Sequence, residues 1–240
     1  MKPECPAPAV LEKHLELPRK LQPAFHFDQN ERWIRWLGHL RDLEPALIAL
    51  PSVLDRRTVA EHVAKYAPTT PIAAFLSVMV WGYGSAGYGP YRVARILTQS
   101  RSPLSAALDE TVVSRLQEGY SIASTAGTTS GYEYMNSTAG RIKHFGPAFF
   151  TKWLYFSTAS NPELRKDAAP ILDRRVLRWL SKQNITLKLG DTESYTRYLA
   201  LLSAWGQDYD VGPSEVEEQI FMLTEIKAPN TLGSRNIACS

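Results

Sequence analysis

One lysine stands alone in an apolar stretch of the chain. Residues 147–159 read PAFFTKWLYFSTA, and Lys152 is the only charged residue among them. At helical spacing its stem would lie among rings such as Phe149 and Tyr155. Such a lysine either extends its ammonium group to water or stays partly dry, and drying lowers its pKa and makes the amine a nucleophile. Taken alone, the residue favours the first arrangement.

A carboxylate breaks the local pattern 21 positions later. On a helical wheel for residues 170–182, PILDRRVLRWLSK, Asp173 falls within the apolar arc, while the three arginines occupy the other. A carboxylate that faces a core needs a partner, but an acidic residue in a first helical turn also interacts favourably with the helix dipole. Both explanations fit Asp173 equally well. Together, Lys152 and Asp173 form a candidate pair of nucleophile and charge stabiliser.

The elements that must position these two residues are helices. Strand-like alternation is scarce, and only residues 185–189 would pass as a short strand. Gly-Pro dipeptides begin at residues 89, 146 and 212 and indicate turns between helices, because glycine permits the turn and proline suits a first helical turn. Pro170 predicts a further helix start. We expect an all-α fold without a β domain, with about ten helices near residues 28–43, 56–67, 71–81, 90–98, 108–124, 132–144, 147–159, 170–182, 192–207 and 213–224.

The N-terminal segment differs from the rest. Five prolines in the first 25 residues predict an irregular arm over residues 1–27, followed by a single helical domain over residues 28–240, with two lobes and a cleft between them. No apolar run is long enough to span a bilayer, and no secretory signal is present, so we expect a soluble cytoplasmic protein without membrane association. Cys5 and Cys239 stand at opposite ends, which predicts free thiols and neither a metal site nor an iron–sulfur cluster.

Charge is distributed unevenly along the chain. Residues 141–188 contain ten lysines and arginines against three acidic residues, a net charge of +7, so the other residues carry −4 within the overall +3. Such a local excess is expected of a segment that binds a polyphosphate backbone. A solvated helical face would show the same composition, and the two explanations have similar weight.

Glycines and aromatic residues alternate in residues 81–91, WGYGSAGYGPY. Glycine lets the backbone approach another surface, and aromatic rings stack on bases or fill the space that an everted base leaves. For any single residue, an ordinary role in the core is the alternative. The candidates for pocket wall or wedge are Trp81, Tyr83, Tyr88, Tyr91 and Phe149, with Trp81 near the pocket and the wedge at Tyr83 or Tyr88.

The segment from Pro147 to Lys152, followed by ILDRRV at residues 171–176, resembles the hairpin-then-aspartate signature of helix-hairpin-helix DNA glycosylases, in particular the 8-oxoguanine glycosylase branch. The resemblance covers roughly residues 72–221. The chain is also similar to a bacterial OGG-like subgroup, some of whose members act against phages by excising bulky modified bases.

The resemblance implies that Lys152 is the nucleophile and that Asp173 assists departure of the base. The chain departs from the family where the hairpin glycines are replaced by Ala148 and Phe150, which weakens the case for phosphate binding there, although Gly146 lies just upstream. It also has neither the cysteine cluster of the endonuclease III type nor the β domain of the eukaryotic enzymes.

The implied activity is that of a DNA glycosylase, which everts a modified base from double-stranded DNA and cleaves its N-glycosidic bond without a cofactor. The first candidate base is 8-oxoguanine, and the second is a hypermodified phage cytosine such as glucosylated hydroxymethylcytosine. Strand cleavage by β-elimination would follow if Lys152 forms a Schiff base. We also expect a monomer. The residues expected to contact the DNA backbone are Arg92, Arg95, Lys143, His144, Gly146, Thr151, Arg174 and Arg175.

Two other classes of function remain open. A helical DNA-binding module that has lost the chemistry would bind DNA without excision, although retention of both Lys152 and Asp173 argues against it. A protein-interaction scaffold would use the acidic residues of the C-terminal helices, whose charges ordinary solvation explains equally well. These residues are Asp208, Asp210, Glu215, Glu217 and Glu218.

Overall fold

Regular structure is almost entirely helical, as the sequence predicts. The computed structural model describes residues 5–28, 30–40, 43–84, 86–163 and 165–225, and within them it holds eleven α-helices and a single pair of two-residue strands. The fold class is therefore all-α. The helices are α1 (Ala9–Leu15), α2 (Asn30–Leu37), α3 (Leu43–Ile48), α4 (Arg56–Tyr66), α5 (Pro71–Tyr83), α6 (Gly89–Thr98), α7 (Glu110–Asn136), α8 (Pro147–Ala159), α9 (Arg174–Lys182), α10 (Thr192–Gly206) and α11 (Pro213–Glu225), and the strands are β1 (Phe25–His26) and β2 (Val53–Leu54).

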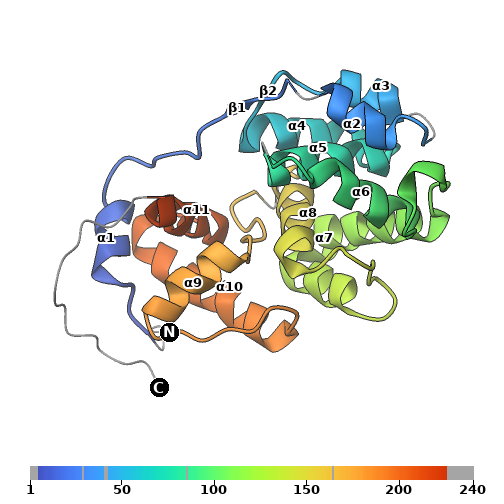
Figure 1. Ribbon diagram of the computed structural model, residues 1–240. Coiled ribbons are helices and arrows are strands. Elements are labelled where there is room, and N and C mark those ends of the chain that lie inside the picture. The colour runs from blue at the N-terminus through green and yellow to red at the C-terminus, as the bar shows by residue number, and fades with distance from the viewer. Residues whose placement is uncertain (1–4, 29, 41–42, 85, 164, 226–240) are drawn as a thin grey trace.

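The helices lie in two groups (Figure 1). Helices α2–α8 form one group, and α1 lies with α9, α10 and α11 in the other. Helix α8 is the centre of the first group, where it packs against α4, α5 and α7, and α10 contacts α7 across the groups. Helices α5 and α8 are buried on almost all sides, which follows from sequences with almost no charge. The single charge of α8, Lys152, is therefore carried into the interior.

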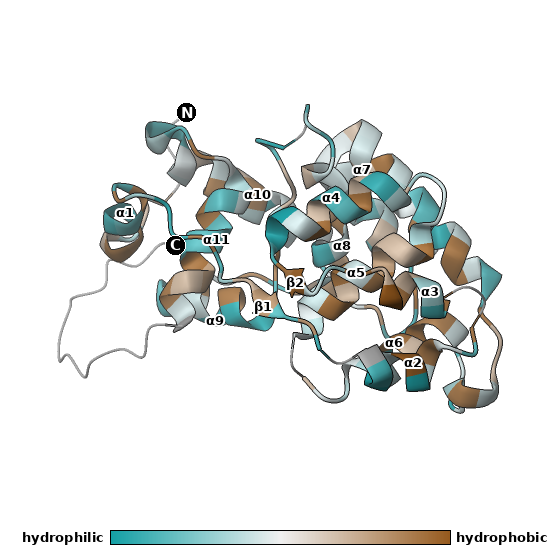
Figure 2. Ribbon diagram, turned by 90° about the horizontal axis from the view of Figure 1, so that it is seen from above, coloured by the Kyte–Doolittle hydropathy of each residue, from teal (hydrophilic) through white to brown (hydrophobic). Residues whose placement is uncertain are grey.

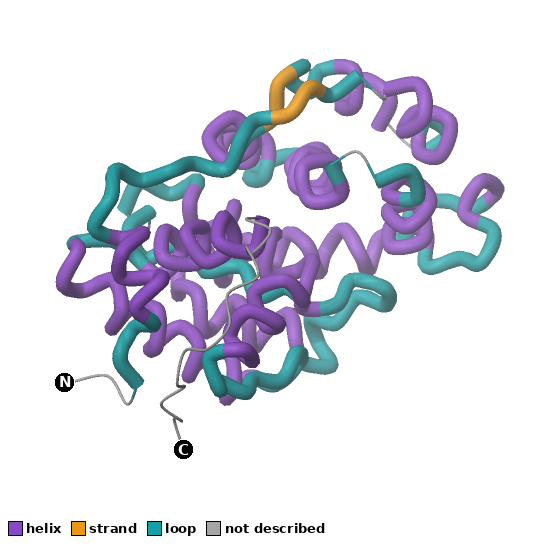
Figure 3. Tube along the Cα trace, turned by 60° about the vertical axis from the view of Figure 1, so that its left-hand side comes forward, coloured by secondary structure: helices purple, strands orange, loops and turns teal. Residues whose placement is uncertain are grey.

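The N-terminal arm is more regular than its prolines predict. Helix α1 fits between Pro8, its N-cap residue, and Pro18, because no proline interrupts residues 9–17. Its Leu11 is fully buried, while hydrophilic residues cover other parts of the helix (Figure 2). The chain then runs as a loop to β1, which pairs antiparallel with β2 (Figure 3). No strand forms at residues 185–189, where alternation suggested one.

Several predicted helix boundaries are wrong for local reasons. Helix α2 ends at Leu37 and α3 begins separately, so residues 28–43 are not one helix. Conversely, α7 continues through residues 124–132, with a kink where Gly127 adopts a φ of 85° that glycine tolerates. Residues 137–146 are a non-helical turn before α8. Pro170 starts no helix, because α9 begins only after Asp173.

Two further expectations concern cysteines and membranes. Cys5 is disulfide-bonded, so the prediction of free thiols is wrong for this residue, and Cys239 lies outside the described residues. In the described part of the chain, no helix combines the length and the apolar character needed to cross a membrane.

Candidate active site

A cavity of about 490 Å³ is lined by residues from both groups of helices. Its walls come from the N-terminal arm, α4, α5, α8, the start of α9 and α11. Pockets of roughly 300–1,000 Å³ are typical of small-molecule sites. Among the described residues, no cluster of His, Cys, Asp or Glu side chains suits a metal ion. Five of the predicted site residues line the cavity: Trp81, Tyr83, Lys152, Asp173 and Arg175.

Lys152 and Asp173 meet in this cavity. The Lys152 Nζ atom lies 3.6 Å from Asp173 Oδ2, and Lys152 as a whole is 8% exposed. Its stem passes Gly82 of α5 so closely that a Cβ atom at residue 82 would lie 2.9 Å from the Lys152 Cδ atom. The Nζ atom is 5.8 Å from the centre of the Trp81 ring. The amine therefore ends inside the cavity instead of reaching bulk water.

Burial is the main influence on the charge of Lys152. It lowers the pKa of the Lys152 amine, while the negative charges of Asp173 and Glu217 oppose this effect and the positive charge of Arg56 adds to it. The direction of this shift increases the share of neutral amine at a given pH. A neutral amine is the form that can act as a nucleophile.

Asp173 performs two structural tasks with its two carboxylate oxygens. Its Oδ1 atom caps α9 by accepting hydrogen bonds from the backbone N–H groups of Arg175, at 2.8 Å, and Val176, at 3.1 Å. Its Oδ2 atom faces Lys152. Asp173 therefore both caps the start of a helix and partners a buried lysine, so the two explanations offered for it apply at once.

A hydrogen bond next to the site connects the two segments. The Thr151 Oγ1 atom accepts a hydrogen bond from the Leu172 N–H at 3.2 Å and donates one to the Pro147 carbonyl at 2.7 Å. Thr151 is fully buried, so the prediction that it contacts the DNA backbone is wrong. It instead connects the residue before Lys152 to the residue before Asp173.

A second ion pair in the cavity was not predicted from the sequence. Arg56, the first residue of α4, donates from both Nη1 and Nη2 to Glu217 Oε2, each at 3.0 Å. Glu217 is 1% exposed, and burial raises its pKa to about 7 although Arg56 opposes the shift. Glu217 and Glu218, which is also buried, are thus not the solvated charges that the sequence suggested. Their positions in an acidic helix gave no sign of burial.

The N-terminal arm supplies another part of the wall. Gln22, Phe25 and His26 line the cavity. The Gln22 N–H donates to Glu218 Oε1 at 3.0 Å, and the Gln22 side-chain oxygen accepts from Arg56 Nε at 3.4 Å. The arm thus contacts α4 and α11 beside the cavity, a role that its composition did not predict.

The predicted pocket and wedge residues divide into two sets. Trp81 and Tyr83 line the cavity, and Phe149 stacks on Tyr83 with ring centres 4.5 Å apart. Phe149, Tyr88 and Tyr91 are not among the residues that line it. Tyr88 is 58% exposed, with the Arg92 guanidinium 5.0 Å from its ring centre. Tyr91 packs edge-on against Trp36.

The residues predicted to contact the DNA backbone form two surface groups. Arg95 of α6 donates to His144 Nε2 at 3.1 Å, which joins α6 to the exposed turn that precedes α8. This first group comprises Arg92, Arg95, Lys143, His144 and Gly146, and the second comprises the exposed Arg174 and Arg175 at the start of α9.

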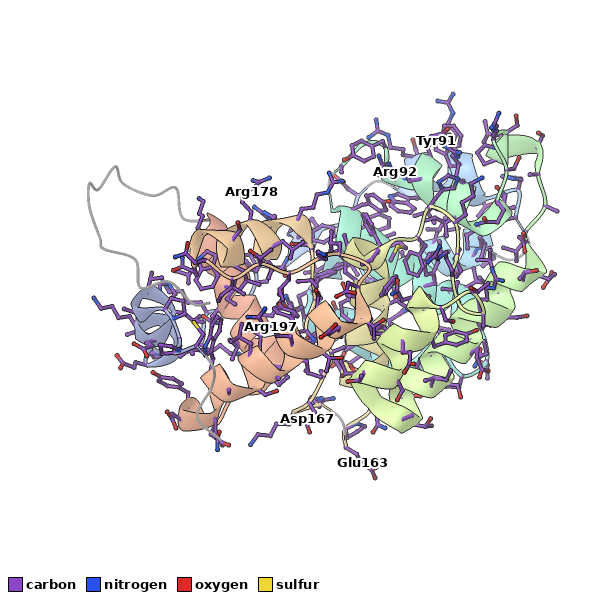
Figure 4. The ribbon with its side chains drawn as sticks, turned by 90° about the horizontal axis from the view of Figure 1, so that it is seen from below. Tyr91, Arg92, Glu163, Asp167, Arg178 and Arg197 are labelled. Carbon is purple, nitrogen blue, oxygen red and sulfur yellow. The ribbon has the colours of Figure 1, made fainter. Side chains whose placement is uncertain are left out.

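The basic stretch of the sequence does not form one surface. Figure 4 shows Arg92 and Arg178 along one edge of the protein, with Glu163 and Asp167 at the opposite edge. Lys166, which is next to Asp167 in the sequence, pairs with Asp210 at 2.5 Å. The lysines and arginines of this stretch are therefore not all available on one face.

Residues 19–221 match the protein family described as "Putative 8-oxoguanine DNA glycosylase OGG-like protein". Comparison with curated proteins and with solved structures finds no match. The matched span contains Lys152 and Asp173, and it also begins early enough to include Gln22 and Arg56. All segments that line the cavity therefore lie within it.

Proposed function

The chain belongs to this family of OGG-like proteins, and we propose that it excises a modified base from duplex DNA with Lys152 as the nucleophile. One observation carries the proposal: an amine and a carboxylate lie 3.6 Å apart inside a cavity that both groups of helices line. Asp173 is the charge-stabilising partner in this proposal.

The first chemical step uses the neutral form of Lys152. The lone pair of Nζ forms a bond to the sugar C1′ atom while the glycosidic bond breaks, and the base departs with the bonding electron pair. The Asp173 carboxylate stabilises the positive charge that develops on the sugar. The nitrogen of the adduct then loses a proton as the sugar ring opens, which yields a Schiff base. Loss of a C2′ proton and of the 3′ phosphate would next cleave the strand by β-elimination.

A variant of this mechanism uses water in place of the lysine. If the C1′ atom lies beyond reach of Lys152, Asp173 would activate a water molecule, and base release would occur with little strand cleavage. Trapping of a covalent intermediate distinguishes the two routes, because only the lysine route forms a Schiff base.

DNA binding in this proposal depends on the two exposed cationic groups. Arg174 and Arg175 lie beside the cavity, and the α6 group lies beside the exposed Tyr88, so phosphate contacts would flank a base-stacking residue. Tyr88 or Tyr83 would fill the space left by the everted base. We propose 8-oxoguanine as the first substrate, in line with the family description, and glucosylated hydroxymethylcytosine as the second, in which case the protein would act in antiphage defence.

Borohydride trapping tests this function. Duplex oligonucleotides that carry 8-oxoguanine, glucosylated hydroxymethylcytosine or an abasic site are incubated with the protein and borohydride, which reduces a Schiff base to a stable amine. We expect a covalent adduct with the wild-type protein, its loss in Lys152→Gln, and its retention in the control Lys13→Gln, which changes an exposed lysine of α1. Absence of both adduct and base release on every substrate would instead support the non-catalytic DNA-binding module.

A further inference from the structure

Four buried or half-buried charges share the cavity. Lys152 and Arg56 supply positive charges, and Asp173 and Glu217 supply negative charges. Among the described residues, Asp173 is the carboxylate within ion-pairing distance of Lys152, whereas Glu217 pairs with Arg56. The charges thus form two pairs. In each pair the cation comes from the α2–α8 group and the carboxylate comes from the other group of helices.

The Arg56 side chain is held firmly in its place. Its guanidinium lies 4.8 Å from the centre of the Tyr155 ring and 5.6 Å from that of Trp81, and only 10% of the side chain is exposed. Two of its N–H groups bind the same Glu217 oxygen, and its Nε atom lies 3.6 Å from Glu218 Oε1. A planar guanidinium that lies near two rings and binds several acceptors has little freedom to move.

Lys152 and Arg56 both lie near the ring of Trp81. Trp81 has the Lys152 Nζ atom 5.8 Å from its ring centre and the Arg56 Cζ atom 5.6 Å from it. Both cations and the Glu217 carboxylate line the same cavity, and burial strengthens the interactions between charges there. The Glu217 carboxylate thus shares the cavity with two possible cationic partners, and it is bound to Arg56.

We propose that Arg56 is a positioning residue for the Lys152 nucleophile: it holds Glu217 through two hydrogen bonds and thereby prevents that carboxylate from pairing with the Lys152 amine. This inference rests on the proposed function of Lys152. A lysine paired with two buried carboxylates would keep its proton and could not attack a sugar. Arg56 thus allows a second carboxylate to line the cavity while the amine stays available.

The charged groups near Lys152 come from several elements, and they set the direction in which each variant changes its pKa. Asp173 precedes α9, Glu217 and Glu218 come from α11, and Arg56 comes from α4. The other titratable groups that line the cavity are His26 from the arm, Tyr83 from α5 and Arg175 from α9. When Arg56 is lost, Lys152 is the buried cation left to pair with Glu217. The pKa of Lys152 therefore rises. Loss of the Glu217 charge leaves Arg56 without its main partner and lowers the pKa of Lys152.

The test follows the pH dependence of adduct formation on a duplex that contains an abasic site, with borohydride and saturating DNA in single-turnover conditions. The variants are Arg56→Gln, Glu217→Gln, the double variant, and the control Arg57→Gln, which changes an exposed neighbour. We expect the midpoint of the acid limb to move up in Arg56→Gln, down in Glu217→Gln, and back close to wild type in the double variant. Below the midpoint, each unit of upward shift lowers the rate about tenfold at fixed pH.

Midpoint shifts of opposite sign in the two single variants, and their cancellation in the double variant, distinguish a positioning role of Arg56 from a purely structural one. Shifts of the same sign in both single variants, or lower rates with unmoved midpoints, would overturn the inference while leaving the proposed function intact. A wild-type protein that forms no adduct would overturn the proposed function itself. If Arg56→Gln does not fold, the comparison continues between Glu217→Gln and the double variant, whose midpoint must be the higher of the two.

Discussion

A single methyl group at residue 82 should separate stability from activity in this protein. Gly82 lies in α5 beside the stem of Lys152, and a Cβ atom there would lie 2.9 Å from Lys152 Cδ and 3.5 Å from Lys152 Cε. The first distance is shorter than the contact of about 3.5–4.0 Å that two carbon atoms prefer. In Gly82→Ala the lysine stem must therefore move by roughly 0.5–1 Å.

The consequences for folding and for chemistry have opposite signs. Alanine in a helix is favoured over glycine by about 0.5–1 kcal/mol, and the flexible lysine stem can move at small cost. The amine, however, is held 3.6 Å from Asp173 and must approach a sugar carbon in a defined direction. A displacement of about 1 Å can cost on the order of a hundredfold in rate. We expect Gly82→Ala to fold with unchanged or higher stability and to form the adduct 10- to 100-fold more slowly, by this order-of-magnitude estimate.

Three measurements on the same preparation check this reasoning. Thermal unfolding reports stability, fluorescence anisotropy reports the affinity for duplex DNA, and single-turnover borohydride trapping reports the rate. We expect the rate to fall, the affinity to stay the same and the stability to be unchanged or higher, with Lys152→Gln as the reference for complete loss of the reaction. A wild-type rate in Gly82→Ala would show that the position of the lysine stem does not limit the reaction, and the reasoning would fail.

Other predictions concern stability and DNA binding. Burial lowers the pKa of His62 to about 4, so below about pH 6.5 the unfolded chain binds a proton that the folded protein does not. The free energy of unfolding should therefore fall by roughly 2–3 kcal/mol from pH 6.5 to pH 4. Chemical denaturation should show a smaller fall in His62→Phe. Arg174→Gln should weaken DNA binding for all sequences alike and reduce the salt dependence of log affinity by about one unit in anisotropy titrations. Asp173→Ala should lower the free energy of unfolding by about 0.5–2 kcal/mol, because the cap of α9 is lost. Asp173→Asn also removes the charge but can still cap the helix, so chemical denaturation should show a smaller loss.

The two residues at the centre of the proposal could be found in the sequence because each breaks a strong local pattern. A charge in a helix as apolar as α8 must be compensated or lead to water, and a carboxylate on the apolar arc of a following helix is a natural partner. Arg56 and Glu217 break no such pattern. Arg56 begins a helix beside a second arginine, Glu217 stands in an acidic segment, and 161 positions separate them. Only the packing of α4 near α11 shows that they pair.

Helix boundaries illustrate the same limit. Gly-Pro dipeptides at residues 89, 146 and 212 correctly indicated the starts of α6, α8 and α11, since the turn chemistry is local. Pro170 carried a similar local preference and was overridden by tertiary contacts. The Pro170 carbonyl accepts a hydrogen bond from Tyr195 OH at 2.9 Å, and the next carbonyl, of Ile171, accepts one from Tyr198 OH at 3.1 Å. Both tyrosines lie on α10, far along the chain.

This displaced helix start is what makes the candidate site possible. If α9 began at Pro170, Asp173 would be an internal helical residue, and its Oδ1 atom would have no free N–H groups to cap. With the start at Arg174, the capping hydrogen bonds fix Oδ1 and leave Oδ2 directed at Lys152. The bond between Thr151 and Leu172 holds the two chain segments together one residue before each partner. The distance between amine and carboxylate is therefore set by backbone contacts that side-chain patterns in the sequence do not reveal.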